Sequence, residues 1–183
     1  MEFIHEWLSP VFPQIRFVHL LSVMIWLWSA SIAYSFLLVT AWKDWRRDPA
    51  NSELRNRRNW VFFHYERGLV LEHSAMLVAL FSGALLVWIS GMDIVATQWL
   101  LIKIIIVMVI LVPLEIMDSW LAHFGGNKRG LKQKGVSDEK FEAYMKLNWL
   151  FLKRSAPIAV VAILMTLYLA VVKPDFLSPS PIV

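Results

Sequence analysis

Four long apolar segments limit what this chain can fold into. They span residues 15–42, 68–89, 97–121 and 155–172, each close to the roughly 20 apolar residues that a helix needs to cross a bilayer. Because lipid cannot hydrogen-bond free backbone groups, such segments must be helical. Hydrophobic residues fill 58% of the 183 positions, more than the roughly half that is usual in soluble domains. We therefore predict an all-α integral membrane protein, with residues 1–183 forming a single four-transmembrane-helix bundle.

The positive charges predict how this bundle is oriented. Except for Arg16, Lys103 and Lys173, all of the 18 Lys and Arg residues lie in the two long connections, 43–67 and 122–154. Positive residues concentrate on the cytoplasmic side of membrane proteins. We therefore expect these connections in the cytoplasm and both termini on the outer side of a bacterial inner (plasma) membrane. The net charge of +4 then indicates topology and contact with membrane lipids, and not nucleic-acid binding.

The two cytoplasmic connections carry helix signals of their own. Asp48 followed by Pro49 is typical of an N-cap and a first helical residue, and Ser137 before Asp138 and Glu139 predicts a second helix start. Both stretches mix aromatic and charged residues, which is typical of helices at a membrane surface. We therefore expect amphipathic cytoplasmic helices in addition to the four spans.

One face of the first span is small or polar apart from a tryptophan. Helical spacing brings together His19, Ser22, Trp26, Ser29 and Ala33. Small residues let membrane helices approach closely, so this face is predicted to look into the bundle.

Ionisable residues near the outer surface form the first candidate site. His19 and Lys103 lie near the outer ends of the first and third spans, at similar depth, with Arg16 one turn above His19. Ionisable groups inside a membrane are costly and often functional. An imidazole and an amine could be the two axial ligands of a haem iron, with Arg16 beside a propionate. In the structural alternative, Lys103 reaches the outer surface and His19 hydrogen-bonds a neighbouring helix.

Acidic and imidazole groups near the inner surface form the second candidate site. Glu115 and Asp118 are three residues apart and share a helical face, and Glu72 and His73 lie at similar depth on the second span. This set would suit a divalent metal, or a proton path with Glu115 and Asp118 as acceptors. Alternatively, the acids only neutralise nearby basic residues. The chain has no cysteine, which excludes thiolate metal sites and covalently attached c-type haem.

Two short motifs carry a resemblance to a known family group. The segment Phe17-Val18-His19-Leu20-Leu21-Ser22-Val23-Met24-Ile25-Trp26 resembles the first-helix motif of the HemJ-type protoporphyrinogen oxidases and the related CopD-type membrane proteins. Trp99-Leu100-Leu101-Ile102-Lys103 resembles the HemJ motif Trp-Leu-x-x-Lys. Pro157 and the run 170–174 are similar to the family's last helix. The entry to that helix, residues 153–157, departs from the family's Asn-Glu-x-Pro.

The resemblance implies a redox protein that holds haem b through His19 and Lys103 as ligands of the haem iron. It would oxidise protoporphyrinogen IX and pass electrons to a quinone or another respiratory-chain partner. Two other classes stay open. One is a non-catalytic subunit of a homo-oligomer or larger membrane complex. The other is a membrane protein that handles copper or another divalent metal, as CopD-type proteins do, through His73, Glu72, Glu115 and Asp118.

Overall fold

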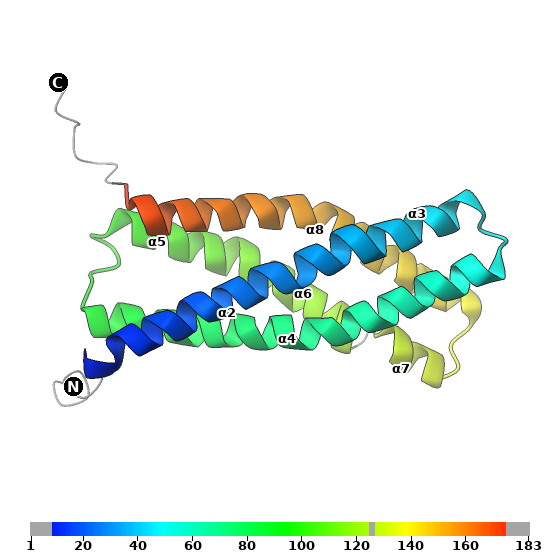
Figure 1. Ribbon diagram of the computed structural model, residues 1–183, viewed down its shortest axis with the longest axis horizontal. Helices are drawn as coiled ribbons and strands as arrows, with labels where there is room; N and C mark the ends of the chain where they lie inside the picture. The colour runs from blue at the N-terminus through cyan, green and yellow to red at the C-terminus, as the bar shows by residue number, and fades with distance from the viewer. Residues whose placement is uncertain (1–8, 125–126, 175–183) are drawn as a thin grey trace, which may run out of the picture.

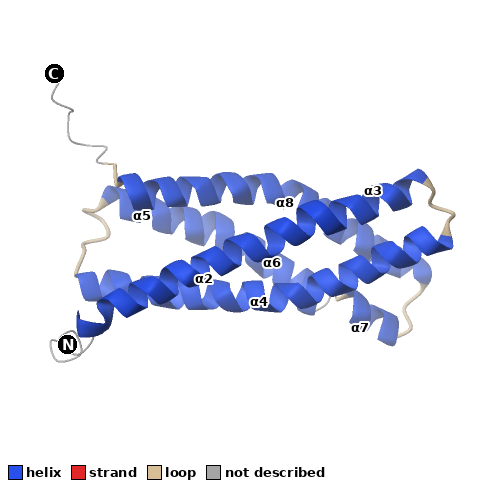
Figure 2. Ribbon diagram, viewed as in Figure 1, coloured by secondary structure: helices blue, strands red, loops and turns tan. Residues whose placement is uncertain are grey.

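The computed structural model describes residues 9–124 and 127–174, with the backbone alone for Ser9 and for residues 28–33, and every regular element in that part is helical (Figures 1 and 2). This confirms the predicted all-α class. In chain order the elements are η1 (Ser9–Val11), α2 (Phe12–Ile32), the π-helical η2 (Ala33–Leu38), α3 (Val39–Arg47), α4 (Ser52–Ser90), α5 (Gln98–Ile106), the π-helical η3 (Val107–Leu111), α6 (Val112–His123), α7 (Lys128–Gln133) and α8 (Asp138–Val172).

Three helical segments are long and apolar enough to cross a membrane. They are α4, the stretch from Gln98 that joins α5, η3 and α6, and α8, which match the second, third and fourth predicted spans. The first predicted span, 15–42, is divided among α2, η2 and α3. The apolar helix at its start, Phe12–Leu27, is shorter than the three long segments. The crossing by this first segment stays a prediction.

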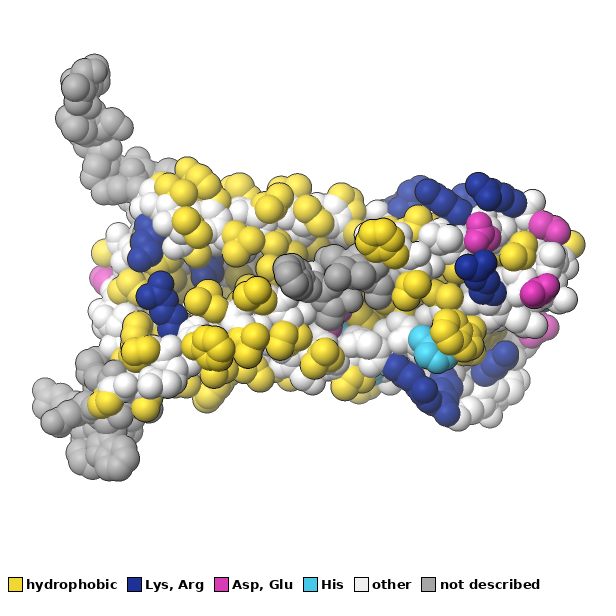
Figure 3. All heavy atoms as spheres, viewed as in Figure 1, with side chains coloured by type: hydrophobic (Ala, Val, Ile, Leu, Met, Phe, Trp, Pro, Cys, Tyr) yellow, Lys and Arg dark blue, Asp and Glu magenta, His cyan; other side chains and the backbone are white. Residues whose placement is uncertain are grey.

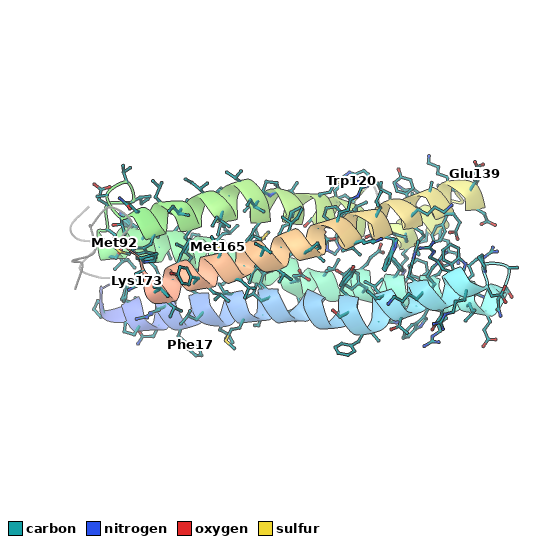
Figure 4. The ribbon with its side chains drawn as sticks, turned by 90° about the horizontal axis from the view of Figure 1, so that it is seen from above. Phe17, Met92, Trp120, Glu139, Met165 and Lys173 are labelled. Atoms are coloured by element: carbon teal, nitrogen blue, oxygen red, sulfur yellow. The ribbon has the colours of Figure 1, made fainter. Side chains whose placement is uncertain are left out.

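The long helices pack side by side in two groups. Helices α2 and α4 run antiparallel and contact each other along much of their lengths, while α5 and η3 pack on α8, and α6 contacts both α4 and α8. Figure 1 shows the start of α2, the α4–α5 loop and the end of α8 at one end of the bundle, with the α3–α4 loop and α7 toward the other. In Figure 4, Met92 and Lys173 lie at the first end and Glu139 at the second. Following the orientation predicted from the charges, we call these the outer and the inner end.

Apolar and basic side chains occupy different parts of the bundle surface. In Figure 3, hydrophobic side chains cover the middle of the visible face, and Lys and Arg gather mainly at the inner end. Phe36, Phe81 and Val171 are 73%, 69% and 80% exposed. Soluble monomers rarely expose a large continuous apolar surface, whereas a surface that faces lipid is expected to be apolar.

The inner end has a core of its own, which joins α3, α4, α7 and α8. Trp42, Phe62 and Met145 are buried there, and the fully buried Arg58 donates two hydrogen bonds to the carboxylate of Glu142, at 2.5 and 2.9 Å. The same guanidinium lies 4.1 Å from the centre of a Trp45 ring. These contacts link α4 to α8 by both apolar packing and a paired charge.

Of the two predicted helix starts, one is confirmed and one is wrong. Ser137 caps α8 and accepts the Lys140 N–H at 3.4 Å. Asp48, in contrast, ends α3, and α4 starts after Asn51. The Asn51 side chain accepts the N–H groups of Glu53 and Leu54 at 2.9 and 3.2 Å, so it satisfies two amides that a helix start leaves open.

The helical stretches of the connections are continuous with the spans. Helix α4 runs for 39 residues and α8 for 35, each from a charged start at the inner end into an apolar half. Pro157 therefore lies inside α8, where its missing N–H leaves the carbonyl of Lys153 without the usual helical hydrogen bond. The predicted spans 68–89 and 155–172 are the apolar halves of these two helices.

Candidate functional site

The predicted inward face of the first helix is confirmed where its side chains are described. Ser22 is 7% exposed and Trp26 is 8% exposed. The side chains of Ser29 and Ala33 lie outside the described residues. Helix α2 therefore turns the face that carries His19 and Trp26 toward α4.

At the outer end, His19 is held by the backbone of α4. Its Nδ1 lies 2.9 Å from the carbonyl oxygen of Ala79 and 3.2 Å from the hydroxyl oxygen of Ser82. A carbonyl only accepts, so Nδ1 carries the proton and Nε2 keeps a lone pair. A Cβ built on Gly83 would come within 3.1 Å of His19 Cε1, so the glycine lets the imidazole lie directly against α4.

Lys103 lies near this imidazole. It is partly buried on α5 and acts electrostatically on His19. Neither Lys103 nor the exposed Arg16 forms a hydrogen bond or an ion pair with a described residue. No hydrogen bond or ion pair thus joins His19, Lys103 and Arg16 to one another.

Halfway along α4, and closer to the inner end than the His19 site is, His73 is the centre of a polar cluster. Its Nε2 lies 3.5 Å from Glu115 Oε2 and 3.4 Å from Asp118 Oδ2, both on α6. Its Nδ1 lies 3.0 Å from His123 Nε2, with the two rings nearly perpendicular. The Trp26 indole N–H donates to Glu115 Oε1 at 2.9 Å. This inner cluster of five side chains joins α2, α4 and α6.

The place of Trp26 in the inner cluster and the contact between His123 and His73 were not predicted from the sequence. Trp26 was predicted to face inward, and a buried indole N–H usually needs an acceptor, which was the available signal. His123 comes at the end of the helix that carries Asp118, but its pairing with His73 spans 50 positions. Glu72, which was predicted beside His73, is buried and lines a cavity next to the cluster.

This cavity has a volume of about 270 Å³ and lies between α2, η2, α4, α6 and α8. Its wall combines aromatic, acidic and aliphatic side chains. The aromatic ones are Trp26, Tyr34, Tyr65 and Phe151, and the acidic ones are Glu72, Glu115 and Asp118. Ser155 and Pro157 belong to the α8 side of the wall. The inner cluster therefore forms one edge of a partly open cavity with largely apolar walls.

Three polar atoms at this edge form no hydrogen bond within the described part of the chain. They are His73 Nε2, Glu115 Oε2 and Asp118 Oδ1, all buried. Most buried polar atoms in proteins have such a partner, so this edge suits a proton, a water molecule or a polar ligand. Among the described residues, no group of three or more His, Asp or Glu is arranged to hold a metal ion. The metal hypothesis for Glu72 and His73 stays a prediction from the sequence.

In comparisons with protein-family models, with curated proteins and with solved structures, this chain has no significant match.

Proposed function

We propose that this chain is a four-span protein of the bacterial inner membrane that binds b-type haem at its outer end and takes part in electron transfer or porphyrinogen oxidation. His19 and Lys103 would hold the haem iron. Both termini lie on the outer side, and the basic inner end lies in the cytoplasm, as the positive-inside rule predicts.

The orientation of His19 carries this proposal. Histidines that bind metal usually donate their other ring N–H to a carboxylate, a carbonyl or water, which fixes the tautomer. The contact between His19 Nδ1 and the Ala79 carbonyl at 2.9 Å is the bond to a neighbouring helix that the structural alternative predicts. It also matches the arrangement in metal sites and leaves Nε2 for the iron. The close fit against Gly83 also restricts how the imidazole can turn.

Lys103 fits the second ligand position. A partly buried amine without an ion pair is costly, and a bond to iron would offset this cost. The donor set is then one imidazole and one neutral amine. Imidazole is a usual axial ligand, and haem, when bound, supplies one-electron redox chemistry.

Other residues would act around this centre. Arg16, exposed at the outer end, would pair with a propionate. Glu115 and Asp118 would accept protons that the oxidation releases. The electron acceptor would be a quinone or another component of the respiratory chain.

The proposal is tested by visible absorption spectra of the detergent-purified chain from haem-replete cells, oxidised and dithionite-reduced. We expect a Soret band that shifts on reduction and is lost in His19→Ala and in Lys103→Ala. His64→Ala is the matched control, because His64 is an exposed imidazole bonded to the Trp60 carbonyl at the inner end. A wild-type protein without a Soret band, or an unchanged band in His19→Ala with normal helix content, would contradict haem ligation.

A further inference from the structure

The cavity beside the inner cluster has more acidic than basic side chains around it. Glu115 and Asp118 face a single imidazole, His73. The nearby Lys128 is already held by Glu66, with its Nζ 2.9 Å from Glu66 Oε1. None of the described residues that line the cavity is Lys, Arg or His. If both carboxylates are ionised, at least one negative charge remains unbalanced even when His73 is protonated. An unbalanced buried charge is costly, so the site must take up a proton or bind a cation.

The walls of the cavity suit an organic cation. Asp118 is 8% exposed, and its Oδ1 accepts no hydrogen bond within the described part of the chain. Glu115 Oε2 also accepts none there, although it lies 3.5 Å from His73 Nε2. Four aromatic side chains complete the wall, and aromatic faces attract cations, most strongly where water is excluded. The volume of about 270 Å³ is just below the range of pockets for drug-sized ligands, about 300–1,000 Å³, which limits the occupant to a small molecule.

We propose that this cavity binds a small organic cation, such as a quaternary or protonated amine that carries one aromatic ring, in exchange for a proton held by the Glu115–Asp118 pair. One positive charge enters and one proton leaves, so charge balances and no electron is transferred. This site is separate from the proposed haem site and uses neither His19 nor Lys103.

The inner cluster provides a route for the displaced proton. His73 Nε2 lies against both carboxylates, and its Nδ1 is 3.0 Å from His123 Nε2. His123 is partly exposed near the inner end, so the proton can pass from the cavity edge through two imidazoles to that surface. The polar and titratable groups around the carboxylate pair, by element, are Trp26 on α2, Tyr34 and Ser35 on η2, Tyr65, Glu66, Glu72 and His73 on α4, His123 on α6, Lys128 on α7 and Ser155 on α8.

The test is titration calorimetry of the detergent-purified full chain with benzyltrimethylammonium chloride, in two buffers of different ionisation enthalpy. This probe keeps its charge at every pH. Neopentylbenzene has the same shape with carbon in place of nitrogen, and therefore isolates the contribution of charge. We expect saturable binding of the cation, release of close to one proton per cation, and weak binding of the neutral probe without proton release.

Substitutions in the cavity wall test whether the cation binds there. Glu115→Gln and Asp118→Asn should each weaken cation binding at least about tenfold, or about 1.4 kcal/mol. Glu139→Gln, which changes an exposed carboxylate at the inner end (Figure 4), should bind as the wild type does. Trp26→Phe keeps both carboxylates and should still weaken binding, because the indole is the larger aromatic face in the wall and attracts cations more strongly than a phenyl ring.

Several results would overturn the proposal. They are the absence of saturable cation binding, equal binding of the two probes, and wild-type affinity in both carboxylate variants. The comparison of the two probes needs no variant, so it decides the matter even if a carboxylate variant does not fold. A missing Soret band would contradict the haem proposal and leave this one untouched.

Discussion

A buried lysine at the inner end has an ion-pair partner, whereas a partly buried lysine at the outer end has none among the described residues. At the inner end, Lys128 is fully buried, lies 2.9 Å from Glu66 Oε1 and donates to the Leu121 carbonyl. At the outer end, Lys103 is partly buried and forms no ion pair or hydrogen bond with a described residue. Lys128 therefore stabilises the fold through its ion pair, whereas the proposed function assigns the Lys103 amine to a ligand.

His73 and His19 also differ in how their imidazoles are bound. His73 has three side-chain neighbours, Glu115, Asp118 and His123, so its charge is shared within a network. His19 is fixed through Nδ1 by the backbone and hydroxyl of α4. A shared imidazole suits proton exchange, whereas a fixed imidazole with one open nitrogen suits a ligand.

The largest expected difference comes from the same change at the two lysines. Lys128→Met removes the charge that balances the buried Glu66, and it should lower the free energy of unfolding by about 3–5 kcal/mol. Lys103→Met removes no ion pair and should cost less than about 1 kcal/mol in haem-free protein. Denaturant unfolding in detergent, followed by circular dichroism, measures both. Equal losses would show that Lys103 is also a structural charge.

A smaller difference is expected between two tryptophans. Trp26→Phe removes the hydrogen bond to Glu115 and should destabilise the protein by about 1.5–3 kcal/mol, since the acceptor is a buried carboxylate. Trp88→Phe changes an indole that is exposed, and it should stay within about 0.5 kcal/mol of the wild type. The same unfolding measurement compares the two variants. A Trp26→Phe protein as stable as the wild type would mean that the inner cluster does not depend on α2.

The smallest difference separates two glycines of α4. Replacing a glycine inside a helix with alanine should stabilise it by roughly 0.5–1 kcal/mol, and Gly68→Ala should show this gain because a Cβ there meets nothing within 4 Å. In Gly83→Ala the Cβ would press on His19 Cε1 from 3.1 Å, so the gain should shrink or reverse. Haem content and thermal unfolding of both variants are the measurements. A full gain in Gly83→Ala with unchanged haem content would show that the imidazole is free to move.

Much of the fold could be predicted from the sequence, but its boundaries could not. The apolar lengths predicted three of the helices that can cross a membrane, and helical spacing predicted the inward direction of Ser22 and Trp26. The start of α4 was predicted at Asp48 and lies at Asn51, because several adjacent residues there suit a cap and only backbone geometry selects one. The continuity of α4 and α8 was missed, since a shift from charged to apolar composition looks like a boundary but breaks no helical hydrogen bond.

The sequence by itself determined that the chain is helical, that its helices are long and apolar enough to cross a membrane, and where its charges gather. These properties depend on composition and on spacing within a few turns. Only the tertiary structure decided which side chains meet. His19 reaches Ala79 across 60 positions, Arg58 reaches Glu142 across 84, and Trp26 reaches Glu115 across 89. Such contacts depend on how each helix is rotated and shifted against its neighbours, and spacing along the chain does not specify this.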